Sequence, residues 1–353
     1  MTEDRAVRGP KRPLAVGGAL ALASALAFGA TTPLVQRFGR GVGPFVTAGL
    51  LYAGAALVSA LAIHGTEAPL RRRDAPRLVA TAILGAVLAP SALAWGLQRT
   101  SGVTATLLLN LEALFTTVLA VVLWAEPIGT RMGGALAAMV CGGAVLVTGG
   151  RAPSLDAWWG PAAVVVATLA WAGDNAVARP LADRDPARVV LAKATIGALA
   201  SFALSRVDEE GRPPASAVAA LTLCGAVGYG ASLRLYLRAQ RAIGAARTAS
   251  LFASAPFVGA AIAWAMGERA PAVPTALAVS LCAVGVWLHL TEEHGHAHSH
   301  EGLAHTHAHR HDDGHHTHGH DALPDVEHSH PHVHAPMTHT HPHGLDEHHR
   351  HKH

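Results

Sequence analysis

Continuous apolar stretches of about twenty residues follow one another through the first 290 of the 353 residues, with short polar connections between them. A helix needs roughly 20 apolar residues to cross about 30 Å of hydrocarbon, whereas the strands of a membrane barrel alternate apolar and polar residues. Because the stretches are continuous, they predict membrane-spanning helices, which satisfy their backbone hydrogen bonds internally. We expect ten spans, at residues 14–36, 44–64, 76–98, 103–124, 128–148, 159–180, 186–205, 215–238, 245–267 and 271–290.

The chain divides into an apolar body and a polar tail. Residues 291–353 hold 23 of the 25 histidines, ten acidic residues and three basic ones, so the tail has a formal charge of −7 with neutral histidine. The body keeps 24 basic and 14 acidic residues and almost all of the apolar ones. Ten spans in 290 residues leave no room for a soluble domain, so the composition argues against an ordinary soluble enzyme.

Basic residues near the span ends predict the orientation in the membrane. Four of them between residues 5 and 12 precede the first apolar stretch, as in a signal peptide. That stretch runs past residue 30 and a later segment repeats it, so we expect a retained helix. With the N-terminus inside, the cytoplasmic connections carry fifteen Lys and Arg residues and the opposite connections carry seven. The positive-inside rule therefore predicts that both termini are cytoplasmic.

The body also contains an internal repeat. One constant offset along the chain aligns Gln98-Arg99 with Gln240-Arg241, Gly102 with Gly244, Phe115 with Phe257, Glu126 with Glu268, and Pro44 with Pro186. Near the start of each half, an offset longer by a single position aligns Leu26-Ala27-Phe28 with Leu169-Ala170-Trp171. One copy contains five helices, an odd number, so the second copy must lie upside down relative to the first. Inverted repeats of this kind are typical of secondary transporters, which hold their solute near the membrane midplane.

Short motifs in the two copies can be compared with those of known families. Leu109-Asn110-Leu111-Glu112-Ala113-Leu114-Phe115, which runs on to Trp124-Ala125-Glu126, is similar to the LEP…F…GE signature of EamA repeats in the drug/metabolite transporter superfamily. Ala113 stands where that family usually has Pro. The second copy, Ser254-Ala255-Pro256-Phe257 running on to Gly267-Glu268, keeps the Pro but has Ser254 in place of Glu112. Residues 171–175 and 228–232 also resemble a bacterial branch of EamA proteins.

The resemblance implies an all-α integral membrane protein with ten transmembrane helices in two inverted five-helix EamA repeats, followed by a disordered tail. Its parts would be a basic cytoplasmic N-terminus at residues 1–13, repeat 1 at 14–150, repeat 2 at 158–291 and the tail at 292–353. It further implies a secondary transporter in a bacterial-type inner membrane, surrounded by lipid, that exports a small metabolite or xenobiotic by alternating access. The superfamily handles many solutes, so the resemblance does not identify the substrate.

Polar side chains inside the apolar spans are the candidate substrate or coupling residues, because a charge at bilayer depth costs about 2.5 kcal/mol or more. Glu112 lies near the middle of its span, with Thr116 on the same helical face. Asp174 and Asn175 share a face with Trp171 in the sixth span. The full candidate set is Glu112, Asn110, Thr116, Trp171, Asp174, Asn175, Lys193, Arg234 and Tyr229.

Two interpretations of the two carboxylates stay open. Glu112 and Asp174 could line a central cavity, where they bind a polar solute or exchange a proton with the coupling gradient. Alternatively, they are fixed counter-charges for Lys193 and Arg234 that hold the helices in register. Asp174 lies closer to a span end, with Arg179 soon after it, and this position favours the structural role for that residue.

From Glu292 onward, histidine alternates with small and polar residues, and too few apolar residues are present for a core to offset the chain entropy. We therefore expect a disordered tail. Imidazole is a good ligand for nickel, zinc, cobalt and copper, so the tail is a candidate metal-binding segment of low specificity. Its roles could be a metal buffer or sensor, a pH-responsive polyelectrolyte, or a neutral extension. The candidate ligands are His294, His296, His298, His300, His305, His307, His309, His311, His315, His316, His318 and His320.

Four classes of function are open to such a chain. A solute exporter of the EamA type is the first, and efflux of a divalent transition metal or a metal chelate, with the tail as a cytosolic buffer, is the alternative. A membrane-embedded enzyme would need a constellation such as HExxH, and a directly ATP-driven pump a GxxxxGK[ST] loop; the sequence contains neither. A membrane-anchored sensor would not need ten spans. We therefore expect a transporter without a required cofactor and without a nucleic-acid partner.

Overall fold

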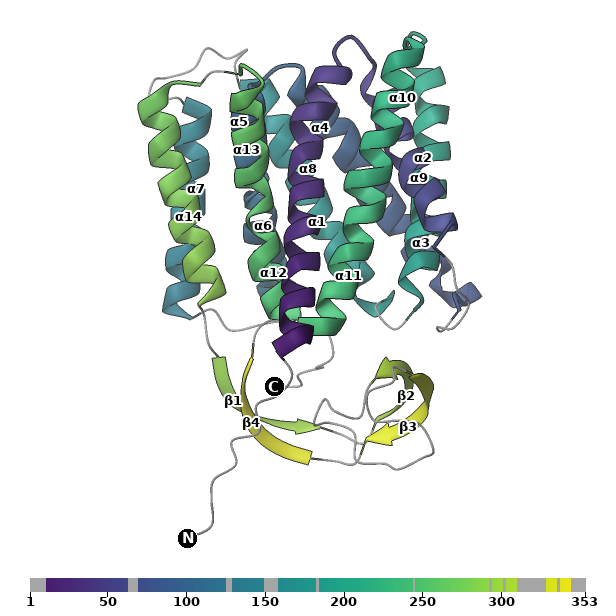
Figure 1. Cartoon of the computed structure of the whole chain (residues 1–353), viewed down its shortest axis with the longest axis vertical. Coiled ribbons are helices and arrows are strands. Elements are labelled where there is room, and N and C mark those ends of the chain that lie inside the picture. The colour runs from purple at the N-terminus through teal and green to yellow at the C-terminus, as the bar shows by residue number, and fades with distance from the viewer. Residues whose placement is uncertain are drawn as a thin grey trace.

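The structure is a computed structural model in which the helices run side by side in one bundle (Figure 1). The start of α1 (Lys11–Phe38) and the end of α14 (Ala272–Leu290) lie at the same end of the bundle (Figure 1). The chain must cross the bundle an even number of times for its first and last helices to begin and end on the same side. The described residues are 11–62, 69–124, 129–148, 158–181, 184–243, 245–268, 270–291, 294–300, 303–309, 328–334 and 337–343.

The ten spans follow in chain order, five in each half. The first half consists of α1, α2 (Pro44–Ala60), a continuous run of η1 (Arg72–Asp74), α3 (Ala75–Thr81), η2 (Ala82–Leu88) and α4 (Ala89–Leu97), then α5 (Gly102–Leu108) with α6 (Leu111–Trp124), and α7 (Thr130–Thr148). The second half consists of α8 (Trp159–Ala178) with η4 (Arg179–Leu181), α9 (Pro186–Val207), a run of α10 (Ala215–Cys224), η5 (Gly225–Ala231) and α11 (Ser232–Ile243), then α12 (Ala245–Phe252) with α13 (Ala255–Ala265), and α14.

Local sequence explains where several of these helices begin. α2 and α9 both start at a proline, Pro44 and Pro186, whose missing N–H needs no partner in a first turn. The Asp185 carboxylate accepts hydrogen bonds from two backbone N–H groups at the start of α9, at 2.9 and 3.4 Å. Glu210, in the connection after α9, accepts two from the first turn of α2, at 2.9 and 2.7 Å. This second carboxylate therefore ties the two halves together at one end of the bundle.

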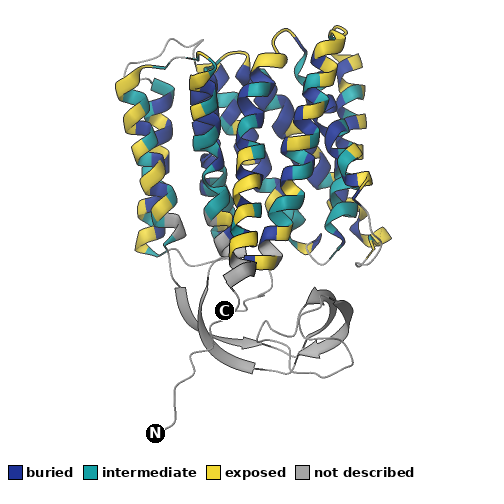
Figure 2. Ribbon diagram, viewed as in Figure 1, coloured by how far each residue is buried: buried dark blue, intermediate teal, exposed yellow. Residues whose placement is uncertain are grey.

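The helix lengths and the outer surface both fit a lipid environment. Seven of the described helical runs are long and apolar enough to span a membrane, and Pro44–Ala60, Ala255–Ala265 and Ala272–Leu288 are shorter apolar helices at the other three expected positions. The outer surface is apolar: Leu57, Val122 and Trp264 keep 62%, 72% and 63% of their area exposed. Figure 2 shows the buried residues on the sides that face the interior of the bundle. Such an apolar surface suits contact with lipid tails, and the chain is a multi-pass membrane protein.

The two halves interlock around a pseudo-two-fold relationship. α2 packs against its counterpart α9, and α7 packs against its counterpart α14. α1 packs against α11 and α13, and α8 correspondingly packs against α4 and α6. One cluster of buried side chains draws on both halves, among them Leu51, Leu93, Trp171 and Leu221. The two repeats therefore share a single core.

The third and eighth spans each contain a π-helical turn. η2 starts at Ala82 and η5 at Gly225, and these two positions are related by the same offset that aligns Phe28 with Trp171 near the beginnings of the two halves. After each turn the backbone hydrogen bond spans five residues: the N–H of Ala89 donates to the carbonyl of Leu84, and that of Ser232 donates to that of Val227. Turns of this kind occur frequently at functional sites.

The sequence predicts one continuous helix for each of the fourth and ninth spans. In the structure each of these spans is instead a pair of shorter helices. In the fourth span, the N–H groups of Leu109 and Asn110 bond to carbonyls three residues back, and the Asn110 side chain donates to the Leu107 carbonyl at 2.9 Å. In the ninth, the Ser254 hydroxyl donates to the Leu251 carbonyl at 2.6 Å, and Pro256 has no N–H to continue a helix. Local side-chain bonds to the backbone thus replace helical ones within two residues of equivalent places in the two halves.

Four segments of the tail, where the sequence predicts disorder, are strands in the structure. β1 (His294–His300) pairs antiparallel with β4 (Met337–His343), and β2 (Leu303–His309) pairs antiparallel with β3 (His328–His334). The alternation of histidine with other residues has the two-residue period of a strand, which explains why these segments can pair. Figure 1 shows the strands beyond the end of the bundle at which α14 ends.

Candidate functional site

A carboxylate and an amide meet between α6 and α8. Glu112 lies in the first turn of α6, directly after the break in the fourth span, and is half-buried. The Nδ2 of Asn175, on α8, donates to its Oε1 at 3.0 Å. A carboxylate at a helix start is stabilised by the helix dipole, and here its side-chain partner is uncharged. Glu112 therefore carries an acidic group at bilayer depth with a neutral amide, rather than a cation, as its described side-chain partner.

The second carboxylate of the region forms a buried ion pair. Asp174, on α8, is 4% exposed, and its Oδ2 accepts a hydrogen bond from the Nζ of Lys193 on α9. Its Oδ1 has no hydrogen-bond partner among the described residues. The pair lies against Gly85 of η2, where a Cβ would collide with Asp174 Oδ2 and press on Lys193 Nζ. Only glycine at this point leaves room for the ion pair beside the backbone.

The backbone of η2 is a hydrogen-bond acceptor for two aromatic side chains. The carbonyl of Gly85 accepts from the Tyr52 hydroxyl, on α2, and from the Nε1 of Trp171, on α8, the latter at 3.1 Å. Side chains from two helices that are distant in sequence, α2 and α8, thus bind to one residue of the π-helical turn. This convergence holds the aromatic side chains in fixed positions beside the ion pair.

Tyr229, on η5, is the centre of an aromatic cluster. Its ring centroid lies 5.5 Å from that of Tyr52, 5.9 Å from that of Phe28 and 6.4 Å from that of Trp171. Glu112 is within electrostatic range of Tyr229, as it is of Asp174 and Lys193. We name Phe28, Tyr52, Glu112, Trp171, Asp174, Asn175, Lys193 and Tyr229 the central group.

Three other residues expected at the site form no ion pair or side-chain hydrogen bond with the central group among the described residues. Asn110 is buried and its amide closes the break between α5 and α6. Thr116 lies one turn along α6 from Glu112 and is half-buried. Arg234 is half-buried on α11, and within the described part of the chain it forms no ion pair with Glu112 or Asp174. Among the described residues, Arg234 is therefore not the counter-charge of either carboxylate, which was one of the two interpretations of the sequence.

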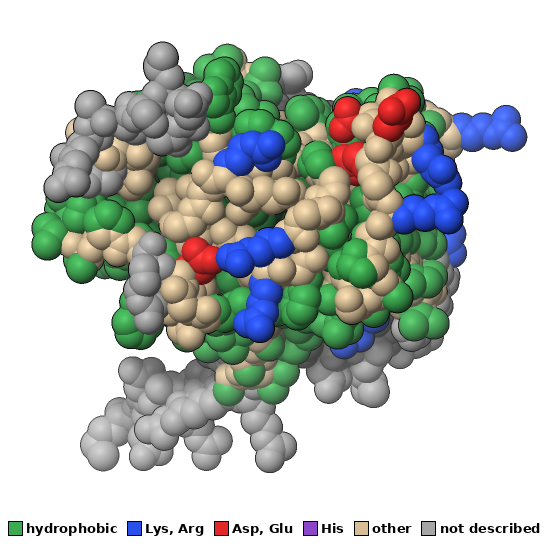
Figure 3. Space-filling view, turned by 90° about the horizontal axis from the view of Figure 1, so that it is seen from above, with side chains coloured by type: hydrophobic (Ala, Val, Ile, Leu, Met, Phe, Trp, Pro, Cys, Tyr) green, Lys and Arg blue, Asp and Glu red, His purple; other side chains and the backbone are tan. Residues whose placement is uncertain are grey.

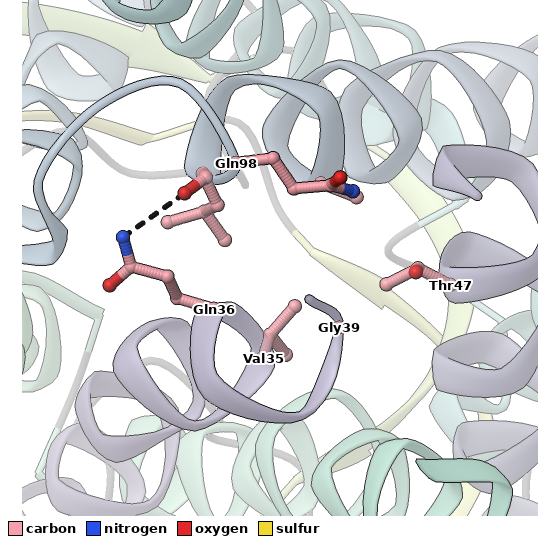
Figure 4. Close-up of a pocket in the computed structure, with 7 residues that line it drawn as sticks. Val35, Gln36, Gly39, Thr47 and Gln98 are labelled. Carbon is pink, nitrogen blue, oxygen red and sulfur yellow. Dashed lines mark hydrogen bonds between the residues drawn. The ribbon is translucent and has the colours of Figure 1, made fainter. Parts of the chain in front are cut away.

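Hydrogen bonds close the end of the bundle opposite the tail. Gln36, 7% exposed, donates to the carbonyls of Leu97 and Thr100 at 3.0 and 2.9 Å. Gln98 donates to the carbonyl of Val42 at 2.9 Å, and a small pocket beside these residues is shown in Figure 4. Seen from above, this end carries acidic and basic side chains among hydrophobic ones (Figure 3), and Arg40 donates to Glu268 there at 3.0 Å. The glutamine bonds join the first, second and third spans where the chain leaves the bilayer.

A family model described as EamA-like transporter family matches residues 15–149 and again 158–291. The chain belongs to this family. No curated protein matches the chain, but a solved structure titled "Crystal structure of protein" is similar to it, with a TM-score of 0.57 and 18% sequence identity over 77% of this chain and 97% of that one. At this identity the likeness supports the fold alone.

Membership of the EamA family makes this chain a membrane transporter of the drug/metabolite transporter superfamily, embedded in lipid and acting on small solutes. The two matched stretches are its two EamA repeats, and the central group draws residues from both. In the described transmembrane body, no three His, Cys, Asp or Glu side chains gather closely enough to hold a metal ion.

The tail histidines can be placed only by the backbone register of the strands. His294, His296 and His298 of β1 stand opposite His343, His341 and His339 of β4. His305, His307 and His309 of β2 stand opposite His332, His330 and His328 of β3, while His300 stands opposite Met337. The other candidate ligands lie outside the described residues, namely His311, His315, His316, His318 and His320.

Sequence reasoning missed several residues of the central group. Tyr52 is one of only three tyrosines in the chain, and its position in an apolar span was the available signal. Phe28 was aligned with Trp171 by the repeat, and both rings now flank Tyr229. Gly85, which lies beside the central group, carried no distinguishing signal, because the chain has 36 glycines and the role of each depends on which helix packs against it.

Proposed function

We propose that this EamA protein exports a small metabolite or xenobiotic from the cytoplasm by alternating access, with both termini cytoplasmic in a bacterial-type inner membrane. The observation that carries the proposal is Glu112, a half-buried carboxylate at bilayer depth whose side-chain hydrogen-bond partner is the neutral Asn175. Such a group can bind a polar solute or exchange a proton with the gradient that drives transport. We assign Glu112 this role, with Asn175 as the residue that positions it.

Asp174 and Lys193 take a different part in the same proposal. Each neutralises the other within a buried contact between α8 and α9, so neither is free to exchange charge with a solute without breaking the pair. We therefore assign the pair a structural role: it fixes the position of α8 against α9 beside the solute path. Tyr229 is half-buried within electrostatic range of Glu112, and its ring lies 6.4 Å from that of Trp171; such aromatic surface suits a solute with an apolar part.

The matched irregularities of the two repeats support alternating access. The π-helical turns η2 and η5 lie at equivalent positions in the two repeats, and the breaks in the fourth and ninth spans lie within two residues of equivalent positions. Bundles of inverted repeats change access by rocking one set of helices against the other around a fixed site. In this proposal the irregular turns are the points at which the spans bend, and the glutamine bonds at the far end break when that end opens.

Efflux of a transition metal or metal chelate is the alternative, and it rests on the tail alone. The strand register sets histidines opposite one another, and imidazole ligands favour nickel, zinc and copper. The metal would be cargo or a signal, and the body lacks a described ligand cluster for it. We therefore keep the organic solute as the proposed cargo.

A growth panel tests the proposal and identifies the cargo. Cells with and without the protein are challenged with amino acids, drugs and metals, and the solute that separates the two strains is then loaded into vesicles containing the purified chain. We expect protection against an organic solute and saturable flux of the same solute across the vesicle membrane. Protection against metals alone would favour the alternative, and no flux of any protected solute would contradict the proposal.

A further inference from the structure

An open groove of about 430 Å³ is lined by none of the residues of the central group. It is lined by Leu70, just before η1, and by Arg188, Leu191 and Ala192, which share one face of α9 at spacings of three and four residues. The third and seventh spans begin here, at the end of the bundle where α1 begins. Arg188 lies nearest the helix start, and the two apolar residues lie one turn farther into the bundle. The groove therefore sits at the boundary between membrane and water.

The described acidic residues beside the groove are already engaged. Asp74 accepts a hydrogen bond from Arg184 Nε at 2.7 Å and another from the backbone N–H of Arg71 at 2.8 Å. Asp185 caps α9, and its Oδ2 lies 3.2 Å from Arg188 Nε. Among the described residues 69–77 and 184–192, six arginines accompany these two aspartates, so four positive charges stay uncompensated. The arginines among residues 71–77 are all exposed.

An occupant of this groove must match both the positive charge and the apolar wall. Guanidinium groups bind phosphate through paired hydrogen bonds, and Arg188 keeps 35% of its side chain exposed at the mouth. Leu70, Leu191 and Ala192 offer no polar partner, but they suit a hydrocarbon chain. A soluble anion would leave this wall unused, and a zwitterionic lipid would bring no net charge. Basic pockets at the cytoplasmic ends of transmembrane helices are where anionic headgroups bind.

We propose that the groove is a binding site for one phospholipid with a net anionic phosphodiester headgroup. Arg188 and the exposed arginines before α3 hold the phosphate, and the apolar residues contact the beginning of an acyl chain. The site is separate from the central group, so this proposal stands whichever solute the protein carries.

Lipid titration of the delipidated full chain tests the site. Phosphatidylglycerol and phosphatidylcholine are added separately, and bound lipid is counted by native mass spectrometry. We expect the unmodified chain to bind phosphatidylglycerol at least about tenfold more tightly than phosphatidylcholine. Both lipids offer an anionic phosphate, but the choline cation of phosphatidylcholine is repelled by the uncompensated arginines beside the groove. Arg188→Gln should remove about the same factor. Arg206→Gln, an exposed arginine at the far end of α9, is the matched control and should leave binding unchanged.

A second variant guards against misfolding of the first, because Arg188 also contacts Asp185. Arg72→Gln combined with Arg73→Gln removes two exposed charges and should weaken phosphatidylglycerol binding without disturbing helix packing. Equal affinity of the unmodified chain for both lipids would overturn the proposal. Undiminished phosphatidylglycerol binding in both variants would also overturn it, and so would displacement of the bound lipid by inorganic phosphate, which would indicate a site for a soluble anion.

Discussion

Asp174 and Thr31 occupy equivalent positions in the two repeats, and each lies against the glycine of a π-helical turn in the opposite repeat. A Cβ on Gly85 would collide with Asp174 Oδ2, and a Cβ on Gly228, the counterpart of Gly85 under the same offset, would collide with Thr31 Oγ1. The two repeats therefore build the same close contact but fill it with a carboxylate in one case and a hydroxyl in the other. The contact at Gly85 therefore carries a charged side chain, Asp174, whereas the equivalent contact at Gly228 carries the neutral Thr31.

The close contact at Gly85 leads to the first prediction. Gly85→Ala should lower the free energy of unfolding by about 1–3 kcal/mol, because the added methyl overpacks the space beside the Asp174–Lys193 pair. Thermal unfolding in detergent measures the change. Gly133→Ala on α7 is the control, since a Cβ there meets nothing within 4 Å, and it should be neutral or stabilising by up to about 1 kcal/mol. Equal behaviour of the two variants would contradict the packing described for η2.

The ion pair leads to a second prediction. Lys193→Met should destabilise the protein by about 3–5 kcal/mol, because it leaves the buried Asp174 carboxylate without its partner. Adding Asp174→Asn to that variant should recover most of the loss, since no buried charge is then left alone. Denaturant unfolding of the single and double variants gives the comparison. A double variant no more stable than the single one would mean that the pair is not coupled.

The glutamine bonds at the closed end lead to a third prediction. Gln36→Leu keeps a similar volume but leaves the carbonyls of Leu97 and Thr100 without their donor, which should cost about 1–3 kcal/mol. Hydrogen exchange should become faster in the connection between α4 and α5. Gln98→Leu removes a single bond, to Val42, and should have the smaller effect. The reverse order of effects would argue against Gln36 as the main tie at this end.

The sequence was sufficient for the spans and for the repeat, because both depend on local hydrophobicity and on matches along the chain. It also brought out Glu112, Asp174 and Asn175, since polar residues in apolar spans are conspicuous. It could not show that Lys193 reaches Asp174 whereas Arg234 does not, because helical periodicity gives the face of a helix but not the neighbour of that face. Nor could it show that the Asn110 amide donates to the Leu107 carbonyl of its own chain segment, because that bond depends on the break between α5 and α6.

The tail is the subject of a fourth prediction. Deletion of residues 292–353 should leave helical content and the unfolding temperature unchanged, because the EamA match ends at residue 291 and the described core cluster is built from helices of both repeats. Circular dichroism and thermal unfolding measure both. If the tail serves metal efflux, cells with the shortened chain should accumulate more nickel, zinc or cobalt than cells with the full one. Equal accumulation would reject that role.

The role of Glu112 is the central claim, and flux through vesicles containing the purified chain tests it most directly. Glu112→Gln keeps an oxygen that can accept from Asn175 but removes the charge, and Asp208→Asn removes an exposed carboxylate at the end of α9 as a matched control. With a proton gradient imposed and the identified solute supplied, we expect Glu112→Gln to lower flux to the level of empty vesicles while Asp208→Asn matches the unmodified protein. Undiminished flux in correctly folded Glu112→Gln would contradict the account.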